Sequence, residues 1–147
     1  MKWVLIIVAL LIGVGFIAYI WMAIQSQKEP DTLGLQQGLL RPCPDSPNCV
    51  CSEAFSQVDK EHAIKPVQAG ETTWERLKSR IIELGGVIKQ DDGHYLHATF
   101  TSSLFHFVDD VELRLDSEHG LIQIRSASRV GRSDFGVNRK RVEQIVQ

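Results

Sequence analysis

Cationic side chains recur at close spacing between Ile124 and Glu143, where the sequence reads IRSASRVGRSDFGVNRKRVE. A guanidinium group presents a planar fork of N–H donors that matches the two oxygens of a carboxylate or phosphate. We name this stretch the polar clasp, because its cations must either pair with acids or bind an anion. The candidate anion- or ligand-binding residues are Arg125, Arg129, Arg139, Arg141 and Asn138.

Acidic and hydroxyl side chains close by could neutralise these cations within the fold. The candidates for such a structural polar network are Asp109, Asp110, Glu112, Ser126, Ser128 and Asp134. We place a structural network first, a site for an anionic small molecule or lipid headgroup second, and an envelope hydrolase third. Asp109 and Asp110 are adjacent on a predicted strand and point to opposite faces, so they are poorly placed to share one substrate proton.

The start of the last predicted helix carries three consecutive cations, Arg139, Lys140 and Arg141. Positive charge in a first helical turn opposes the helix dipole, so an acid or a bound anion must offset it. Asn138 is expected to cap this helix. We expect Arg139 and Arg141 to be the guanidinium groups left unpaired, because a helix N-terminus also favours anions.

The cysteines offer a second chemistry in a proline-rich loop that reads RPCPDSPNCVCS from Arg41. In an oxidising compartment a disulfide would close this loop, either Cys43–Cys49 or Cys43–Cys51. Cys49 could alternatively be a nucleophile, but it has no recognisable His or Asp partner nearby. A zinc site needs a fourth ligand, which a single C-x5-C-x-C pattern does not supply.

Other catalytic and metal patterns are weak. The sequence has no H-E-x-x-H, G-x-S-x-G or GxxxxGK[ST] motif. His94 and His97 are three residues apart on a predicted strand, so they point to opposite faces and cannot both bind one metal from there. We expect a protein that is not an enzyme, with no cofactor and no metal.

The overall charge argues against a nucleic-acid partner. The 147-residue chain has a formal net charge of −2, whereas nucleic-acid-binding domains are usually basic. An acidic half before Ile124 and a basic half after it most simply neutralise each other. The length allows one domain plus an anchor.

An apolar run from Trp3 to Ile24 contains no charged side chain. At a rise of about 1.5 Å per residue it spans about 33 Å, enough for the core of a bilayer. The rival interpretation is a cleaved signal peptide, but the run is too long, and Ile20-Trp21-Met22 is a poor cleavage context. We therefore expect residues 1–25 to be a transmembrane anchor that contacts the membrane through residues 3–24.

The soluble part should lie outside the cytoplasm. Lys2 precedes the run and Lys28 and Arg41 follow it, so the positive-inside rule is nearly balanced. A short tail before a signal-like span usually stays in the cytoplasm. We expect a single-pass protein of the inner (cytoplasmic) membrane, with a polar tether at residues 26–40 and a periplasmic domain at residues 41–147. The tether's leucines indicate that it lies against the domain or the membrane surface.

The pattern of the soluble part predicts an α+β fold: an antiparallel sheet of about four or five strands with one long and one short C-terminal helix. Thr72 and Glu75 have the spacing of a capping box. The helix that follows should bury one face and end at Gly85-Gly86. That face contains Trp74, Leu77, Ile81, Ile82 and Leu84. His62–Val67 is predicted to be a short strand.

The remaining strands are expected at residues 87–90, 95–101, 108–115 and 121–128. Only one pairing register of the last two strands keeps the apolar side chains of both strands on the same face of the sheet, with Leu115 opposite Ile122. This register places Glu112 opposite Arg125 on the outer face, where an exposed pair contributes about 0.2–1 kcal/mol. It also turns Asp109 toward the core, where an Arg from the next segment is its natural partner. Leu104, Phe105 and Phe107, in the loop 102–107, are expected to fill the edge of the core in preference to contacting lipid.

Three segments in this order, RPCPDSPNCV, VDDVELRL and the polar clasp, resemble the DUF1499 family over residues 38–147. The resemblance implies an exported or membrane-linked setting and carries no established activity or catalytic residue. It favours Cys43 and Cys49 as the disulfide pair and leaves Cys51 as the odd thiol. We therefore expect a membrane-anchored envelope protein with a non-catalytic binding or structural domain. Its partner would be an anionic ligand or another envelope protein.

Overall fold

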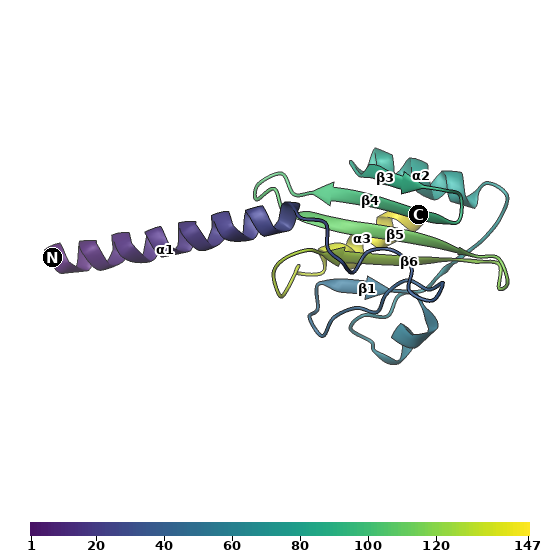
Figure 1. The fold of residues 1–147 in the computed structure, drawn as a ribbon, viewed down its shortest axis with the longest axis horizontal. Helices are drawn as coiled ribbons and strands as arrows, with labels where there is room; N and C mark the ends of the chain where they lie inside the picture. The colour runs from purple at the N-terminus through teal and green to yellow at the C-terminus, as the bar shows by residue number, and fades with distance from the viewer.

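The computed structural model describes residues 1–147 as one long helix and a compact α+β domain (Figure 1). Helix α1, Lys2–Gln27, projects away from the domain and is long and apolar enough to cross a membrane. The other elements are β1 (Cys49–Cys51), the 3-10 helix η1 (Ala54–Val58), β2 (Val67–Gln68), α2 (Thr73–Glu83), β3 (Val87–Asp91), β4 (Tyr95–Thr101), β5 (Val108–Asp116), β6 (Leu121–Ser128) and α3 (Val137–Val146). The predicted fold class is confirmed.

The sheet has six antiparallel strands in the order β1-β6-β5-β4-β3, with β2 also paired to β6. The predicted hairpin register is confirmed, because Leu115 lies opposite Ile122 and Glu112 opposite Arg125. The prediction of a strand over His62–Val67 was wrong. Only Val67–Gln68 pairs with β6, and Ala63 makes a single bridge to Cys51.

Helices α2 and α3 cover one face of the sheet and enclose the apolar core. Its fully buried side chains include Leu77 and Ile81 of α2, Val111 and Leu113 of β5, and Ile145 of α3. Strand alternation explains this face, since apolar residues at every second position of β4, β5 and β6 point the same way. Ile82 does not join them and is 55% exposed, because one step along a helix rotates a side chain by about 100° from Ile81.

The predicted C-terminal stop of α2 is present, but the predicted N-terminal cap is not. The capping box does not form: Thr72 has helical backbone angles and makes no side-chain cap hydrogen bond. A cap residue normally has extended angles that bring its oxygen to the first free amides. The glycine stop is confirmed, since Gly85 has φ 89°. A Cβ on Gly86 would lie 2.6 Å from Ile81 Cγ2 and 2.8 Å from Phe100 Cζ.

The segment 28–44 covers the other face of the sheet, which would otherwise face solvent (Figure 1). Gly34 N donates to Tyr95 Oη at 3.2 Å and to Glu112 Oε1 at 2.9 Å. Leu40 is 1% exposed and packs with Cys51 and Tyr95. The tether therefore lies against the domain, one of its two expected positions. This segment buries one face of the sheet, and α2 and α3 bury the other.

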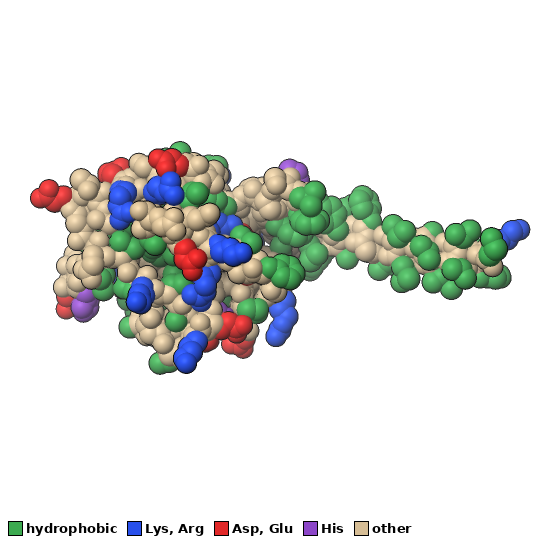
Figure 2. Space-filling model, turned by 180° about the vertical axis from the view of Figure 1, so that it is seen from behind, with side chains coloured by type: hydrophobic (Ala, Val, Ile, Leu, Met, Phe, Trp, Pro, Cys, Tyr) green, Lys and Arg blue, Asp and Glu red, His purple; other side chains and the backbone are tan.

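The loop 102–107 does not fill the edge of the core, so that expectation was wrong. Leu104 and Phe105 are exposed, and the rings of Phe105 and Phe107 lie against Tyr19 of α1. The loop extends beyond the sheet toward α1 (Figure 1) and packs against that helix instead. Figure 2 shows hydrophobic side chains along α1 that continue onto the adjoining part of the domain.

Candidate functional site

Charged and polar side chains on β4, β5 and β6 form a continuous layer beneath the segment 28–44. We call it the polar layer and define it as Tyr95, His97, Asp110, Glu112, Arg114, Gln123 and Arg125, joined by Glu53 and Arg129. The strand residues occupy alternate positions, so they share the face opposite the apolar core. All seven strand residues are buried. Buried charges require partners, and most of this layer is paired.

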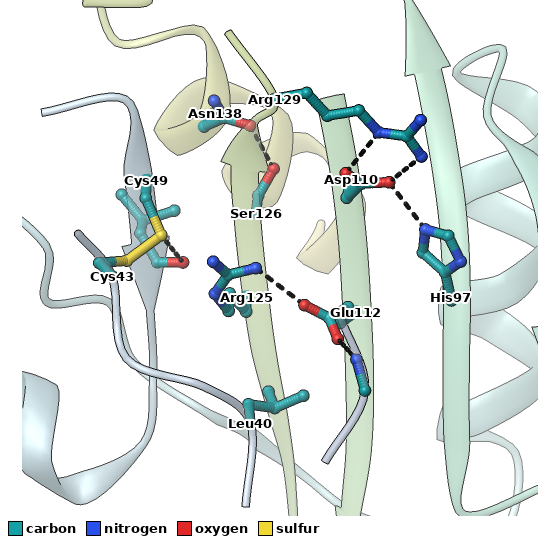
Figure 3. Close-up of polar contacts among 12 residues, drawn as sticks. Leu40, Cys43, Cys49, His97, Asp110, Glu112, Arg125, Ser126, Arg129 and Asn138 are labelled. Carbon is teal, nitrogen blue, oxygen red and sulfur yellow. Dashed lines mark hydrogen bonds and ion pairs between the residues drawn. A yellow bond between two sulfur atoms is a disulfide. The ribbon is translucent and has the colours of Figure 1, made fainter. Parts of the chain in front are cut away.

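Arg125 and Glu112 form the central pair (Figure 3). Arg125 Nη1 donates to Glu112 Oε2 at 2.9 Å, and the two side chains are 4% and 0% exposed. The predicted pair is present, but its expected exposure was wrong, because the segment 28–44 covers it. Glu112 Oε1 also accepts a hydrogen bond from Tyr95 Oη at 2.7 Å. Burial, and then the neighbouring Glu112 carboxylate, raise the pKa of Tyr95, so its hydroxyl remains a donor.

A second buried pair, Arg114 with Glu53, was missed by sequence reasoning. Arg114 donates from Nε and Nη2 to the two oxygens of Glu53 at 2.7 and 2.9 Å. Leu40 N donates to Glu53 Oε1 at 3.0 Å, which holds the covering segment against the domain at Leu40. Arg114 continues the alternation of Asp110 and Glu112, so the sequence predicts the face of the sheet on which it lies. The sequence does not predict its partner, Glu53, which lies 61 residues earlier in the chain.

Asp110 is the acceptor at the end of the polar layer nearest to α1. It accepts from His97 Nε2 at 2.8 Å and from Arg129 Nε and Nη2 at 2.8 and 2.7 Å. Burial raises the pKa of Asp110, but the hydrogen bonds from Arg129 and His97 outweigh it, so the pKa lies below its usual value. Asp110 therefore stays ionised and holds both donors in place (Figure 3).

Asp109 lies on the opposite face, as strand alternation predicts, and pairs with the last helix. Arg141 Nη2 donates to Asp109 Oδ2 at 2.6 Å. The same guanidinium donates to Asn138 Oδ1 at 2.6 Å and lies 4.7 Å from the centre of the Phe100 ring. The predicted partner for Asp109, an arginine from the following segment, is thus present. Asp109 and Asp110 face away from each other and cannot share a proton.

Asn138 does not cap α3, so that prediction was wrong. The helix begins at Val137, two residues earlier than a cap at Asn138 would give. The Asn138 side chain is buried against Ser126 Oγ (2.5 Å) and Ser128 Oγ (2.9 Å). Asp134 instead accepts hydrogen bonds from the free backbone amides at the start of the helix, from Gly136 N at 2.9 Å and from Asn138 N at 2.7 Å. Its carboxylate also offsets the cations of the first turn.

The expectation that Arg139 and Arg141 are left unpaired was wrong, because both have partners in the fold. Arg139 donates to the carbonyl oxygens of Ala63 and Glu61, both at 2.9 Å, and Arg141 is held by Asp109. Arg125 is the exception within the polar clasp: its Nε is buried and has no hydrogen-bond partner. The structure thus brings Arg125 and Arg129 together and places Arg139 and Arg141 elsewhere. A ligand-binding role for these residues remains a prediction.

A cavity of about 420 Å³ lies between the covering segment and strands β5 and β6. It is lined by Pro30, Thr32, Pro42, Cys43, Pro44, Asp110, Arg125, Ala127, Ser128 and Arg129. Cys43, which lines the cavity, forms a disulfide with Cys49, and the Cα atoms of the two cysteines are 5.6 Å apart. This pairing confirms the one that the family resemblance implied. Cys51 is a free, fully buried thiol whose pKa is raised by burial.

The comparisons with known proteins extend the sequence resemblance. A family model described as "Protein of unknown function (DUF1499)" matches residues 39–147, most of the chain and all of the domain's strands. No curated protein and no solved structure matches the chain. The family assignment is confirmed, and it brings no activity with it.

Proposed function

The chain belongs to the DUF1499 family, and we propose that it is a single-pass envelope protein whose domain binds a small anionic ligand without catalysing a reaction. In this proposal α1 spans the inner (cytoplasmic) membrane and the domain lies on its periplasmic side. The ligand occupies the cavity between the segment 28–44 and the polar layer. The remaining ion pairs are structural and hold that cavity open.

The observation that carries the binding proposal is the guanidinium of Arg125. It lines the cavity, is 4% exposed, and forms its one side-chain hydrogen bond through Nη1 to Glu112. Its buried Nε has no partner. A buried donor without an acceptor costs about 1–3 kcal/mol, so an oxygen of a bound ligand at this position would be favoured. The Nε and Nη2 edge of arginine suits the paired oxygens of a carboxylate or phosphate.

The other walls favour a small ligand of low charge. Arg125 and Arg129 are each matched by one carboxylate, Glu112 and Asp110, so these four side chains carry no net charge. A multiply charged ligand would leave excess negative charge in a buried space. Prolines at the mouth are conformationally rigid, which favours a preformed site for a compact ligand.

The disulfide supports a periplasmic location for the domain. Disulfides persist in oxidising compartments and are rare in the cytosol, and Cys43–Cys49 lies within the domain. A fusion of alkaline phosphatase after residue 30 tests this location, since that enzyme is active only when exported. We expect an active fusion. An inactive phosphatase, together with an active cytoplasmic reporter at the same position, would overturn the topology.

Ligand binding is tested by native mass spectrometry of the full chain released from detergent. We expect a small anion bound to the wild-type protein and lost in Arg125→Lys, because lysine can still pair with Glu112 but has no Nε–Nη2 edge. Arg139→Lys is the matched control, since Arg139 contacts only carbonyl oxygens outside this cavity. Wild type without a bound anion, and without thermal stabilisation by inorganic phosphate or acetate, contradicts the proposal. The polar layer would then have a structural role alone.

A further inference from the structure

The loop between β4 and β5 carries two exposed apolar side chains beside α1. It reads SSLFHF from Ser102 to Phe107 and contains no charged side chain other than a histidine. Leu104 is 73% exposed and Phe105 is 47% exposed. Figure 2 shows that the hydrophobic surface of the domain is continuous with that of α1 at this junction. We call residues 102–107 the wedge loop.

The aromatic rings of the wedge loop pack on α1 well before the helix ends. Tyr19 lies 6.0 Å from Phe105 and 6.2 Å from Phe107, measured between ring centroids, and those two phenylalanine rings stack at 5.6 Å. Tyr19 lies eight positions before Gln27, the last residue of α1, which corresponds to about 12 Å along a helix axis. The loop therefore reaches back along the anchor, into the level of the apolar run.

The backbone at the two ends of the wedge loop is held by hydrogen bonds within the protein. Ser102 N donates to the Phe107 carbonyl at 2.9 Å, and His106 N donates to the Ser102 carbonyl at 3.0 Å. Phe107 N donates to Ser102 Oγ at 3.0 Å. Gln27 Nε2 donates to the His106 carbonyl at 2.9 Å. Pairing of these groups lowers the cost of placing the two ends of the loop near hydrocarbon, where an unpaired amide costs several kcal/mol.

The domain is attached to α1 so that the wedge loop cannot swing away. Val108 N donates to Ser26 Oγ at 2.7 Å, and Ser26 is fully buried. Arg129 Nη1 donates to the Lys28 carbonyl at 3.1 Å, just after the helix. These contacts join the strand that follows the loop to the end of the anchor. The position of the loop along the membrane normal is therefore set by the position of α1.

We propose that Leu104 and Phe105 insert into the outer leaflet beside α1 and form a second membrane contact, which holds the domain in one orientation on the bilayer. The inference rests on the proposed membrane-spanning role of α1. The occupant is lipid because the loop lies beside Tyr19, inside the apolar run, and because aromatic side chains favour the membrane interface. The absence of Lys and Arg from the loop indicates contact with acyl chains and not with anionic headgroups.

Spin-label depth measurements test this insertion in the full chain. The background is Cys51→Ser, which leaves the buried disulfide as the remaining cysteine pair under non-reducing conditions. Single labels are placed at Leu104→Cys, at Ile17→Cys in α1, and at Glu118→Cys on the exposed β5–β6 turn. The proteins are reconstituted in phosphatidylcholine vesicles, and their thermal unfolding is compared with the unlabelled background.

We expect the labels at 104 and 17 to collide mainly with oxygen, and the label at 118 mainly with a water-soluble nickel chelate. If the label at 104 is as accessible to nickel as the label at 118, while the label at 17 remains in lipid, insertion of the wedge loop is refuted. The membrane-spanning role of α1 is then unaffected. Nickel accessibility at both 104 and 17 overturns the anchor itself. Spin–spin broadening at 104 that vanishes on dilution with unlabelled protein shows contact with a second copy, which also overturns insertion.

Discussion

Arg129 connects helix α1 to the sheet through Asp110. Its Nε and Nη2 donate to the two carboxylate oxygens at 2.8 and 2.7 Å, while its Nη1 lies 3.4, 3.4 and 3.1 Å from the carbonyl oxygens of Ser26, Gln27 and Lys28. The last carbonyls of a helix lack intrahelical partners, and a cation there is favourable. One guanidinium thus satisfies a buried carboxylate and the end of α1 together.

Replacement of Arg129 by alanine should be among the most destabilising single changes in the domain. Asp110 is 2% exposed and would keep only His97 as a donor, so we expect the free energy of unfolding to fall by about 3–5 kcal/mol. Chemical denaturation of the detergent-solubilised protein measures the change. Arg132→Ala, at an exposed arginine in the same loop, is the control and should alter stability by no more than about 0.5 kcal/mol. Equal effects of the two variants would refute this role for Arg129.

Asp110 should also contribute to acid sensitivity. Its pKa is lowered in the folded state, so its stabilisation is complete above the unfolded value of about 3.9 and is lost as pH falls through the lower folded value. The melting temperature of wild type should therefore fall more steeply between about pH 5 and about pH 3 than that of Asp110→Asn. Asp31→Asn, at an exposed carboxylate, is expected to keep the wild-type slope. Parallel curves for all three proteins would be inconsistent with the ionised Asp110 described here.

The burial of Glu112 predicts a large difference between two ion pairs of similar geometry. Glu112→Gln removes the charge partner of Arg125 inside the polar layer, and we expect a loss of about 3–5 kcal/mol. Glu83→Gln removes the partner of Arg80 on the surface of α2 and should cost about 0–1 kcal/mol. Denaturant midpoints of the two variants provide the comparison. A loss below about 1 kcal/mol for Glu112→Gln would show that solvent reaches the pair.

Asp109→Asn should loosen α3 from the hairpin. The substitution weakens a hydrogen bond between charged groups at 2.6 Å, for which we expect a loss of about 1.5–3 kcal/mol. Thermal unfolding gives the overall loss, and hydrogen exchange of the α3 amides shows whether it is local to the helix. A melting temperature equal to that of wild type would contradict a structural role for this pair.

The amino-acid sequence was sufficient wherever a short-range pattern decides the outcome. Period-two alternation placed Leu115 opposite Ile122 and Glu112 opposite Arg125, because a slip of one residue would turn the apolar side chains to the wrong face. The same alternation separated Asp109 from Asp110. The length of the apolar run predicted α1, and the resemblance of the cysteine loop predicted Cys43–Cys49.

Tertiary structure decided what covers each face and which partners meet. Gly34 contacts Glu112 across 78 positions, and Arg114 contacts Glu53 across 61, so no local pattern could show that the outer face is buried. The same long-range folding paired Arg141 with Asp109 and left Arg125 Nε as the buried donor without a partner. Alternation determines which side chains share a face, because it is a property of the strand itself. The environment of that face depends on segments far away in the chain, and here it turned an expected surface into a buried polar layer.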